Sequence, residues 1–113
     1  MELDLIEETI TQAALDLKAI NLIRFDMENT SSLSDFVIIC HGTSTTHVRG
    51  IADNISLNCK KADVLPLGVE GYEEGEWVLM DYNSVIVHIF LEETREIFNL
   101  EEIFETLSSE KFE

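Results

Sequence analysis

Two apolar runs separated by only two residues dominate the hydrophobic pattern of this 113-residue chain. The runs are 77–82 and 85–90, and the dipeptide Asn83-Ser84 between them is typical of a tight β-hairpin. A stretch punctuated by Gly68, Gly71 and Gly75 leads into the first run. We therefore expect residues 66–90 to form the centre of the fold.

A two-residue turn fixes how the two strands pair and face, because successive side chains of a strand alternate between the faces of a sheet. The expected pairs are Trp77 with Phe90, Leu79 with His88, and Asp81 with Ile86. The other face would carry Val78, Met80, Tyr82, Val85, Val87 and Ile89. Both faces are largely apolar, which predicts a sheet centre covered on two sides.

The pattern before the hairpin predicts two helices around a first pair of strands. Apolar residues recur at helical spacing from Leu3 to Leu17, which indicates an amphipathic helix closed by Asn21. Residues 22–27 and 36–40 favour strands, with a turn-rich loop at 28–32. The hydroxyl residues at 43–45 offer an N-cap for a second helix. Its apolar stripe would be Val48, Ile51, Ala52, Ile55 and Cys59.

The pattern after the hairpin predicts a last helix. Asn99, followed three residues later by Glu102, indicates a capping box for it, with a shorter helical turn at 92–98 and frayed residues at 108–113. Val64 and Leu65 precede the only proline and lead into the hairpin region. The predicted order is α-β-β-α-β-β-β-α. It describes one α/β domain over 1–113, with a core at about 3–107 and a mixed sheet flanked by helices.

Charge limits the choice of partner. Seven basic residues against 23 acidic ones give a net charge of −16 and a pI near 4.3. Such a field repels phosphate backbones, which argues against direct binding to nucleic acid. It favours a basic protein partner, although the same charge can serve only to keep a small protein soluble.

The sequence also argues against a membrane-spanning segment and against a targeting peptide. No stretch approaches the roughly 20 apolar residues of a membrane span, and the acidic N-terminus MELDLIEETI is unlike a signal or transit peptide. Cys40 and Cys59 are too few for a disulfide framework. We expect a cytoplasmic protein with no membrane partner.

Candidate metal ligands and phosphate contacts are weakly supported. Cys40, His41, His47 and Cys59 have the spacing C-H-x5-H-x11-C, which matches no common zinc pattern. The loop 42–45 could hold a phosphate at a helix N-terminus, but it lacks the lysine and glycine spacing of a P-loop. Hydroxyls at such a position more often act as caps. We predict no metal and no cofactor.

Catalytic residues are not predicted either. Asp81 stands alone at the end of its strand, whereas two-metal chemistry needs several converging carboxylates. No serine lies in a nucleophile motif. His88 leaves two interpretations: a partly buried side chain satisfied by a backbone carbonyl or by Asp81, or a partner contact beside Trp77. Trp77 itself fits the rim of an interface as well as it fits the core.

A collinear series of short motifs resembles the ribosomal silencing factor (RsfS, Iojap-related) family. The motifs are Ser32-Leu33-Ser34-Asp35, Gly42-Thr43-Ser44-Thr45 with His47-Val48, Ile51-Ala52-Asp53-Asn54, the segments 66–71, 75–82 and 85–90, and Glu93-Thr94-Arg95-Glu96 with Asn99-Leu100-Glu101. They cover most of 20–105 in the family's order and spacing. Cys40-His41 departs from the family's small residues, and Phe98 stands where tyrosine is common.

The resemblance implies a nucleotidyltransferase-like fold without catalytic carboxylates and therefore a protein that is not an enzyme. It implies binding to the large ribosomal subunit through ribosomal protein L-fourteen, a basic protein on the joining face. The bound factor would block small-subunit association and lower translation under starvation, and the free protein would form a homodimer. The contact residues carried over from the family are Glu70, Tyr72, Trp77, Met80, Asp81 and Tyr82.

Two other functions stay open on the sequence. One is assembly or maturation of the large subunit through the same contacts, as organelle relatives suggest. The other is a small nucleotide-binding enzyme of nucleotidyltransferase type that uses Ser44, Thr45 and Asp81.

Overall fold

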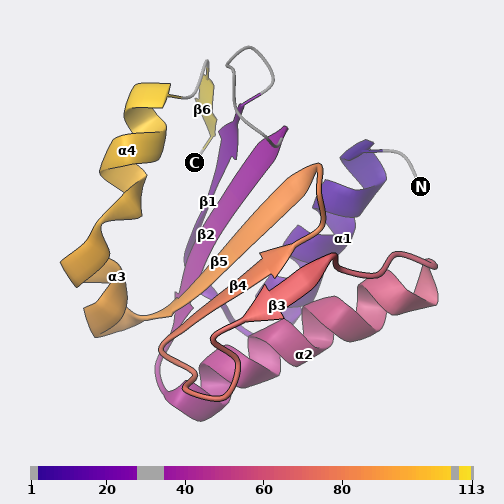
Figure 1. The fold of residues 1–113 in the computed structure, drawn as a ribbon, viewed down its shortest axis with the longest axis horizontal. Helices are drawn as coiled ribbons and strands as arrows, with labels where there is room; N and C mark the ends of the chain where they lie inside the picture. The colour runs from indigo at the N-terminus through magenta and orange to yellow at the C-terminus, as the bar shows by residue number, and fades with distance from the viewer. Residues whose placement is uncertain (1–2, 28–34, 108–109, 113) are drawn as a thin grey trace.

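A six-stranded mixed sheet forms the middle layer of the protein (Figure 1). The computed structural model describes residues 3–27, 35–107 and 110–112. The strands are β1 (Ile20–Asp26), β2 (Phe36–Gly42), β3 (Gly68–Glu70), β4 (Trp77–Asp81), β5 (Val85–Leu91) and β6 (Glu110–Phe112). Their order is β3-β4-β5-β2-β1-β6, and only β2 and β5 pair in parallel. The predicted helix-covered mixed sheet is confirmed.

Helices cover both faces of this sheet. α1 (Leu3–Asp16) and α2 (Thr45–Lys61) pack on one face, and α3 (Glu92–Phe98) and α4 (Leu100–Leu107) lie over the other (Figure 1). The radius of gyration is 12.8 Å and the principal extents are 35 × 34 × 22 Å. None of the helices in the described ranges combines the length and the apolar character that a membrane span requires.

The β4–β5 hairpin has the predicted register. The Cα partners include Trp77 with Phe90, Leu79 with His88, and Asp81 with Ile86. The turn is closed by a hydrogen bond from the Tyr82 N–H to the Val85 carbonyl at 2.9 Å, and Asn83 takes a left-handed φ of 70°. The six residues predicted for the other face are all buried, in the core between the sheet and the helices α1 and α2.

The two faces of the sheet carry cores of different size. The larger core includes the predicted α2 stripe, whose residues Val48, Ile51, Ala52, Ile55 and Cys59 are all buried. The smaller core on the other face consists of Phe25, Met27, Val37, Ile39 and Phe90. Because only the short helices α3 and α4 lie over this second face, part of it stays open toward β3 and β4 (Figure 1).

Ser44 caps α2 as the sequence predicts, because its Oγ accepts a hydrogen bond from the His47 N–H at 3.0 Å. We expect Ser44→Ala to lower the free energy of unfolding by about 1 kcal/mol. Urea denaturation followed by circular dichroism measures the change. Ser56→Ala, in the middle of the same helix, is the control and should cost less, and equal losses in the two variants would contradict the cap.

The structure corrects the end of the first helix. α1 ends at Asp16 rather than at Asn21, and the chain reverses at Lys18, which has a φ of 61°. Asn21 lies inside β1 with a φ of 48°, where the register against β2 shifts between Ile20 and Ile23. The left-handed asparagine therefore marks a β-bulge rather than a helix terminus.

The strand after α2 is Gly68–Glu70, beyond the proline. Two expectations near the C-terminus were wrong. Asn99 ends α3 with a φ of 45°, and its Nδ2 donates to Glu102 Oε2 at 3.0 Å instead of capping the Glu102 N–H. Residues 110–112 are not frayed, because they pair with β1. The rest of the predicted frayed segment and the predicted loop at 28–32 lie outside the described residues.

Candidate partner-binding surface

A cluster of aromatic rings lies on the open part of the second sheet face, around Trp77. The Trp77 ring stacks on Phe90 with centroids 5.0 Å apart and contacts Phe98 of α3 at 4.9 Å. Its indole N–H donates to His88 Nδ1 at 3.1 Å. These contacts hold the half-buried indole in one orientation, and the exposed Phe98 extends the apolar surface beside it.

A shallow hollow of about 280 Å³ lies beside Trp77 and is lined by Glu70, Gly71, Trp77 and Leu79. Gly71 shapes it, because its φ is 79° and an added Cβ would clash with the backbone carbonyl oxygen of Trp77. The close approach of these two backbones brings Glu70 next to the aromatic cluster. We call Glu70, Trp77, Leu79 and Phe98 the Trp77 surface.

Two of the predicted contact residues are in the core. Met80 is 1% exposed and Tyr82 is 5% exposed, and both side chains lie on the sheet face that α1 and α2 cover. Side chains at even and odd positions of a strand point to opposite faces, so neither can share a surface with Trp77. Met80 and Tyr82 are therefore removed from the candidate surface.

Two other predicted contacts have structural partners. The Tyr72 hydroxyl donates to Asp53 Oδ2 on α2 at 3.1 Å, and this hydrogen bond, followed by burial, raises the pKa of Tyr72. Asp81 Oδ1 accepts the Asn83 N–H at 2.8 Å and so stabilises the hairpin turn. Both side chains are half-buried. Whether Glu70, Tyr72, Trp77 and Asp81 contact a partner stays a prediction.

Phe98 and Leu79 are members of the Trp77 surface that the sequence interpretation missed. Phe98 is 51% exposed at the end of a short helix, and only the ring contact with Trp77 shows that it belongs to this face. Leu79 follows from the strand alternation, since it lies two residues after Trp77 and pairs with His88. Strand alternation could therefore have identified Leu79 from the sequence.

His88 is buried beneath the aromatic rings, with Phe104 of α4 at 6.0 Å on one side. Burial lowers the pKa of His88 to about 4, so the ring is neutral at physiological pH and can accept the Trp77 N–H. Neither a backbone carbonyl nor Asp81 satisfies this ring nitrogen, contrary to the first of the two sequence interpretations. His88 supports Trp77 from below.

The candidate metal ligands do not converge. Cys40 and Cys59 are buried in the larger core, and burial raises the pKa of Cys40 to about 12 and also raises that of Cys59. His41 contacts Arg95 on the other side of the sheet, and His47 Nε2 lies 2.6 Å from the Leu17 carbonyl oxygen. In the described part of the chain, no group of three or more His, Cys, Asp or Glu residues could hold a metal ion.

Two backbone donors at the candidate phosphate loop are already in use. The Thr43 N–H donates to His47 Nδ1 at 2.9 Å, and the His47 N–H donates to Ser44 Oγ. We expect isothermal titration calorimetry with ATP and Mg²⁺ to show no binding heat, since a nucleotide would have to displace these bonds. A saturable heat that Ser44→Ala abolishes would instead support the nucleotidyltransferase alternative.

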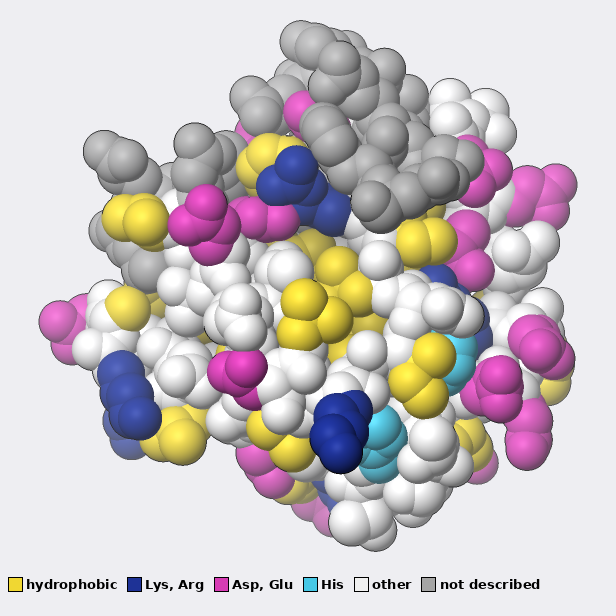
Figure 2. Space-filling model, turned by 180° about the vertical axis from the view of Figure 1, so that it is seen from behind, with side chains coloured by type: hydrophobic (Ala, Val, Ile, Leu, Met, Phe, Trp, Pro, Cys, Tyr) yellow, Lys and Arg dark blue, Asp and Glu magenta, His cyan; other side chains and the backbone are white. Residues whose placement is uncertain are grey.

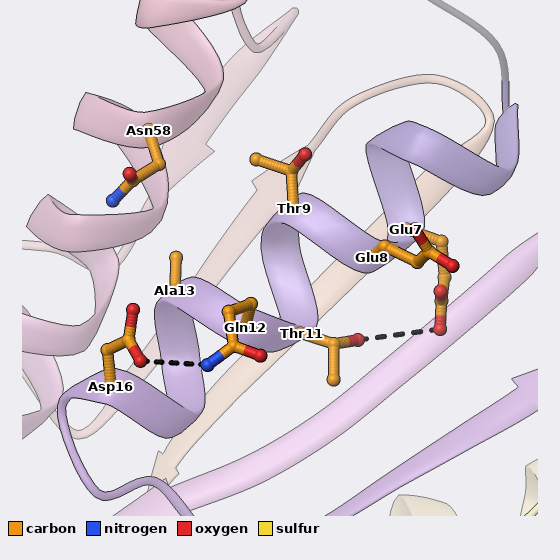
Figure 3. A pocket seen from close by; sticks show the side chains of 8 residues that line it. All are labelled: Glu7, Glu8, Thr9, Thr11, Gln12, Ala13, Asp16 and Asn58. Atoms are coloured by element: carbon orange, nitrogen blue, oxygen red, sulfur yellow. Dashed lines mark hydrogen bonds between the residues drawn. The ribbon is translucent and has the colours of Figure 1, made fainter.

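A larger hollow of about 540 Å³ lies between α1 and α2, and half of its eight lining residues pair with one another (Figure 3). Gln12 donates to Asp16 at 2.8 Å, Thr11 donates to Glu7 at 3.4 Å, and Arg24 pairs with Glu7 at 2.7 Å. An open groove in which these polar groups are already paired offers little to a ligand.

Acidic side chains gather over the edge of the molecule that α3 and α4 form, on the right in Figure 2. The exposed glutamates of this edge include Glu92, Glu93, Glu96 and Glu102. The edge adjoins the Trp77 surface through Phe98, the last residue of α3. An aromatic surface beside a negative edge is complementary to a basic protein that carries apolar groups.

Comparison of the sequence with known proteins gives a consistent result. The family model described as "Ribosomal silencing factor during starvation" matches residues 3–113. Ribosomal silencing factor RsfS of Haemophilus influenzae is 39% identical over 88 residues, which are 78% of this chain and 86% of that protein. RsfS of Chromobacterium violaceum is 33% identical over 104 residues, covering 92% of this chain and 85% of that one.

Solved structures have the same fold. A crystal structure of a Chromobacterium violaceum protein superposes with a TM-score of 0.89 at 32% identity, covering 93% of this chain and 88% of that one. One from Bacillus halodurans superposes with a TM-score of 0.85 at 31% identity, covering 97% and 98%. A more distant mouse relative, 29% identical over 76 residues, is named "Mitochondrial assembly of ribosomal large subunit protein 1", and the match covers 32% of it.

Proposed function

Because this chain belongs to the family of ribosomal silencing factors during starvation, we propose that it binds the large ribosomal subunit through ribosomal protein L-fourteen and blocks joining of the small subunit. Translation then falls when nutrients are scarce, without a chemical reaction and without a cofactor. The observation that carries this proposal is the Trp77 surface, in which a half-buried tryptophan contacts an exposed phenylalanine at the acidic edge of the protein.

Charge decides which part of a ribosome such a protein can dock on. A net charge of −16 repels RNA phosphates and attracts a basic ribosomal protein, and it speeds their encounter. Trp77 and Phe98 then supply the desolvated centre of the contact, since tryptophan is a common hot-spot residue. Glu70, exposed beside Trp77, supplies a charged group at the rim.

Size is sufficient to prevent subunit joining. The thinnest extent of the protein is 22 Å. Macromolecular interfaces are packed to the density of protein interiors, so a bound body of this thickness keeps the two surfaces apart. The mechanism therefore needs only tight binding at a place on the joining face.

Co-sedimentation tests the proposed partner. Purified protein is mixed with isolated large and small subunits separately, and with purified ribosomal protein L-fourteen. We expect binding to the large subunit and to the isolated ribosomal protein, weakening as salt is added because part of the attraction is electrostatic. Absence from the large-subunit fraction, or equal recovery with the small subunit, contradicts the proposal.

A role in assembly of the large subunit is the second candidate, and the name of the mouse relative favours it. Such a factor uses the same docking surface but binds a different particle. Cells that lack the protein would then accumulate immature large subunits even during rapid growth. Normal large-subunit profiles in those cells, with loss of repression only in starvation, would favour silencing.

A further inference from the structure

A pocket of about 630 Å³ is lined by residues of α3 other than Phe98, the residue of this helix that contacts Trp77. It is formed by β1, the end of β2 and the helices α3 and α4. Its polar lining includes His41, Glu92, Arg95, Glu96 and Glu101. This is the largest hollow among those described above, and neither the Trp77 surface nor the hairpin uses it.

The floor of the pocket is a buried arginine whose Nε and Nη1 have partners in the protein. Arg95 is 6% exposed, and its Nε donates to Glu101 Oε2 at 3.2 Å. Its Nη1 lies 3.3 Å from the Ile20 carbonyl oxygen and 2.8 Å from His41 Nδ1. Since an arginine has no acceptor, His41 must accept at Nδ1 and carry its proton on Nε2. Burial and the Arg95 charge lower the pKa of His41, in keeping with this neutral form.

The remaining charges of the pocket are negative. Arg95 is balanced by Glu101, whereas Glu92 and Glu96 are exposed at the mouth. The other oxygen of Glu101, Oε1, is buried and has no hydrogen-bond donor among the described residues. A buried acceptor without a donor is costly and uncommon, and it adds to the negative character of this side of the pocket.

The chemistry of the lining selects the kind of ligand. A metal ion is not supported, because no described group of three or more His, Cys, Asp or Glu residues could hold one. An anion would meet three carboxylates, and the Nε and Nη1 of the arginine already have protein partners. A guanidinium or ammonium group instead supplies positive charge and several N–H donors at once.

We propose that this pocket receives an arginine or lysine side chain of the basic protein that docks on the Trp77 surface. The inference rests on the proposed function for the identity of the partner. Helix α3 links the two sites, because Phe98 contacts Trp77 while Glu92, Arg95 and Glu96 of the same helix line the pocket. One partner can therefore place an apolar group on one side of α3 and a cation on the other.

NMR titration of the full chain with N-acetyl-arginine amide tests the pocket by itself. We expect backbone shifts at Asn21, Glu96 and Glu101 and at the Arg95 Nε–H, and none with N-acetyl-glutamine amide, which has no charge.

The double variant Glu92→Gln/Glu96→Gln should lower the affinity for the arginine probe about tenfold, because two nearby carboxylates are lost. Glu93→Gln/Glu102→Gln is the matched control, since these exposed glutamates flank the pocket without lining it. The inference is overturned if the two double variants lose the same affinity for the probe, or if the chemical-shift changes spread over the whole acidic surface.

Large-subunit binding by the same variants tests the partner. The variant Glu92→Gln/Glu96→Gln should bind the large subunit about tenfold more weakly than wild type, and the control variant Glu93→Gln/Glu102→Gln should lose much less affinity. Equal affinities overturn the inference while the proposed function stands, provided that Trp77→Ala loses binding. If the wild-type protein does not bind the large subunit, the proposed function fails, and the cationic side chain that enters the pocket does not come from ribosomal protein L-fourteen. The probe titration then decides alone whether the pocket takes a cation.

Discussion

Trp77→Ala should weaken binding to the large ribosomal subunit by at least about 2 kcal/mol, or about thirtyfold in affinity. The indole is the centre of the Trp77 surface, with Phe90 stacked at 5.0 Å and Phe98 at 4.9 Å. Removing it deletes the apolar contact and also leaves Phe98 without its neighbour. Titration of labelled large subunits with the variant measures the loss.

The control for this prediction is Leu57→Ala. Leu57 is 51% exposed on α2, on the opposite side of the sheet, so its removal deletes an exposed apolar side chain away from the proposed contact. Circular dichroism and urea denaturation show whether each variant is folded. A folded Trp77→Ala protein that binds as tightly as wild type would place the interface elsewhere.

Acidification should destabilise the protein through His88, by about 2 kcal/mol between about pH 7.5 and about pH 5. The pKa of His88 is lowered from 6.5 to about 4, so in this range the unfolded ring binds a proton that the folded ring does not. The stability is therefore complete above pH 6.5 and is lost as the pH falls toward 4. A protonated ring also cannot accept the Trp77 N–H.

His88→Phe isolates this contribution, because it keeps an aromatic ring and removes the titration. Chemical denaturation is followed by fluorescence of Trp77, which is the single tryptophan of the chain. The pKa of His41 is also lowered, so acid weakens both proteins, and the difference between their two pH profiles is the quantity of interest. Parallel profiles for wild type and variant would show that His88 is not buried in its neutral form.

Local patterns were enough to predict the centre of this fold. The two-residue spacing between the runs determined the register of β4 and β5, and alternation along each strand determined which side chains are buried. The stripe of α2 and its Ser44 cap are likewise local, since helical spacing and a cap lie within a few residues. Such features depend little on the rest of the chain.

Features that depend on distant segments could not be predicted in this way. β6 is a strand because β1 offers it a free edge, although its own residues suggest a polar tail. Asn21 takes a left-handed conformation because β1 must pair with β2 on both sides of a bulge. In both cases tertiary pairing overrides the local preference.

The candidate surface was predicted in part. Alternation already places Met80 and Tyr82 on the face opposite Trp77, and the structure buries both. Phe98 joins Trp77 across about 20 residues of chain, and the pocket floor joins Arg95 to His41 across 54 positions, so spacing could reveal neither. These contacts arise only because α3 folds back over the sheet.

Subunit joining is the most direct measurement of the central claim. Large subunits are incubated with the protein, small subunits are added, and the fraction of joined ribosomes is measured on a sucrose gradient. We expect joining to fall as the protein approaches a one-to-one ratio with the large subunit, and Trp77→Ala to restore it. Unchanged joining, with the protein bound to the large subunit, would contradict steric silencing.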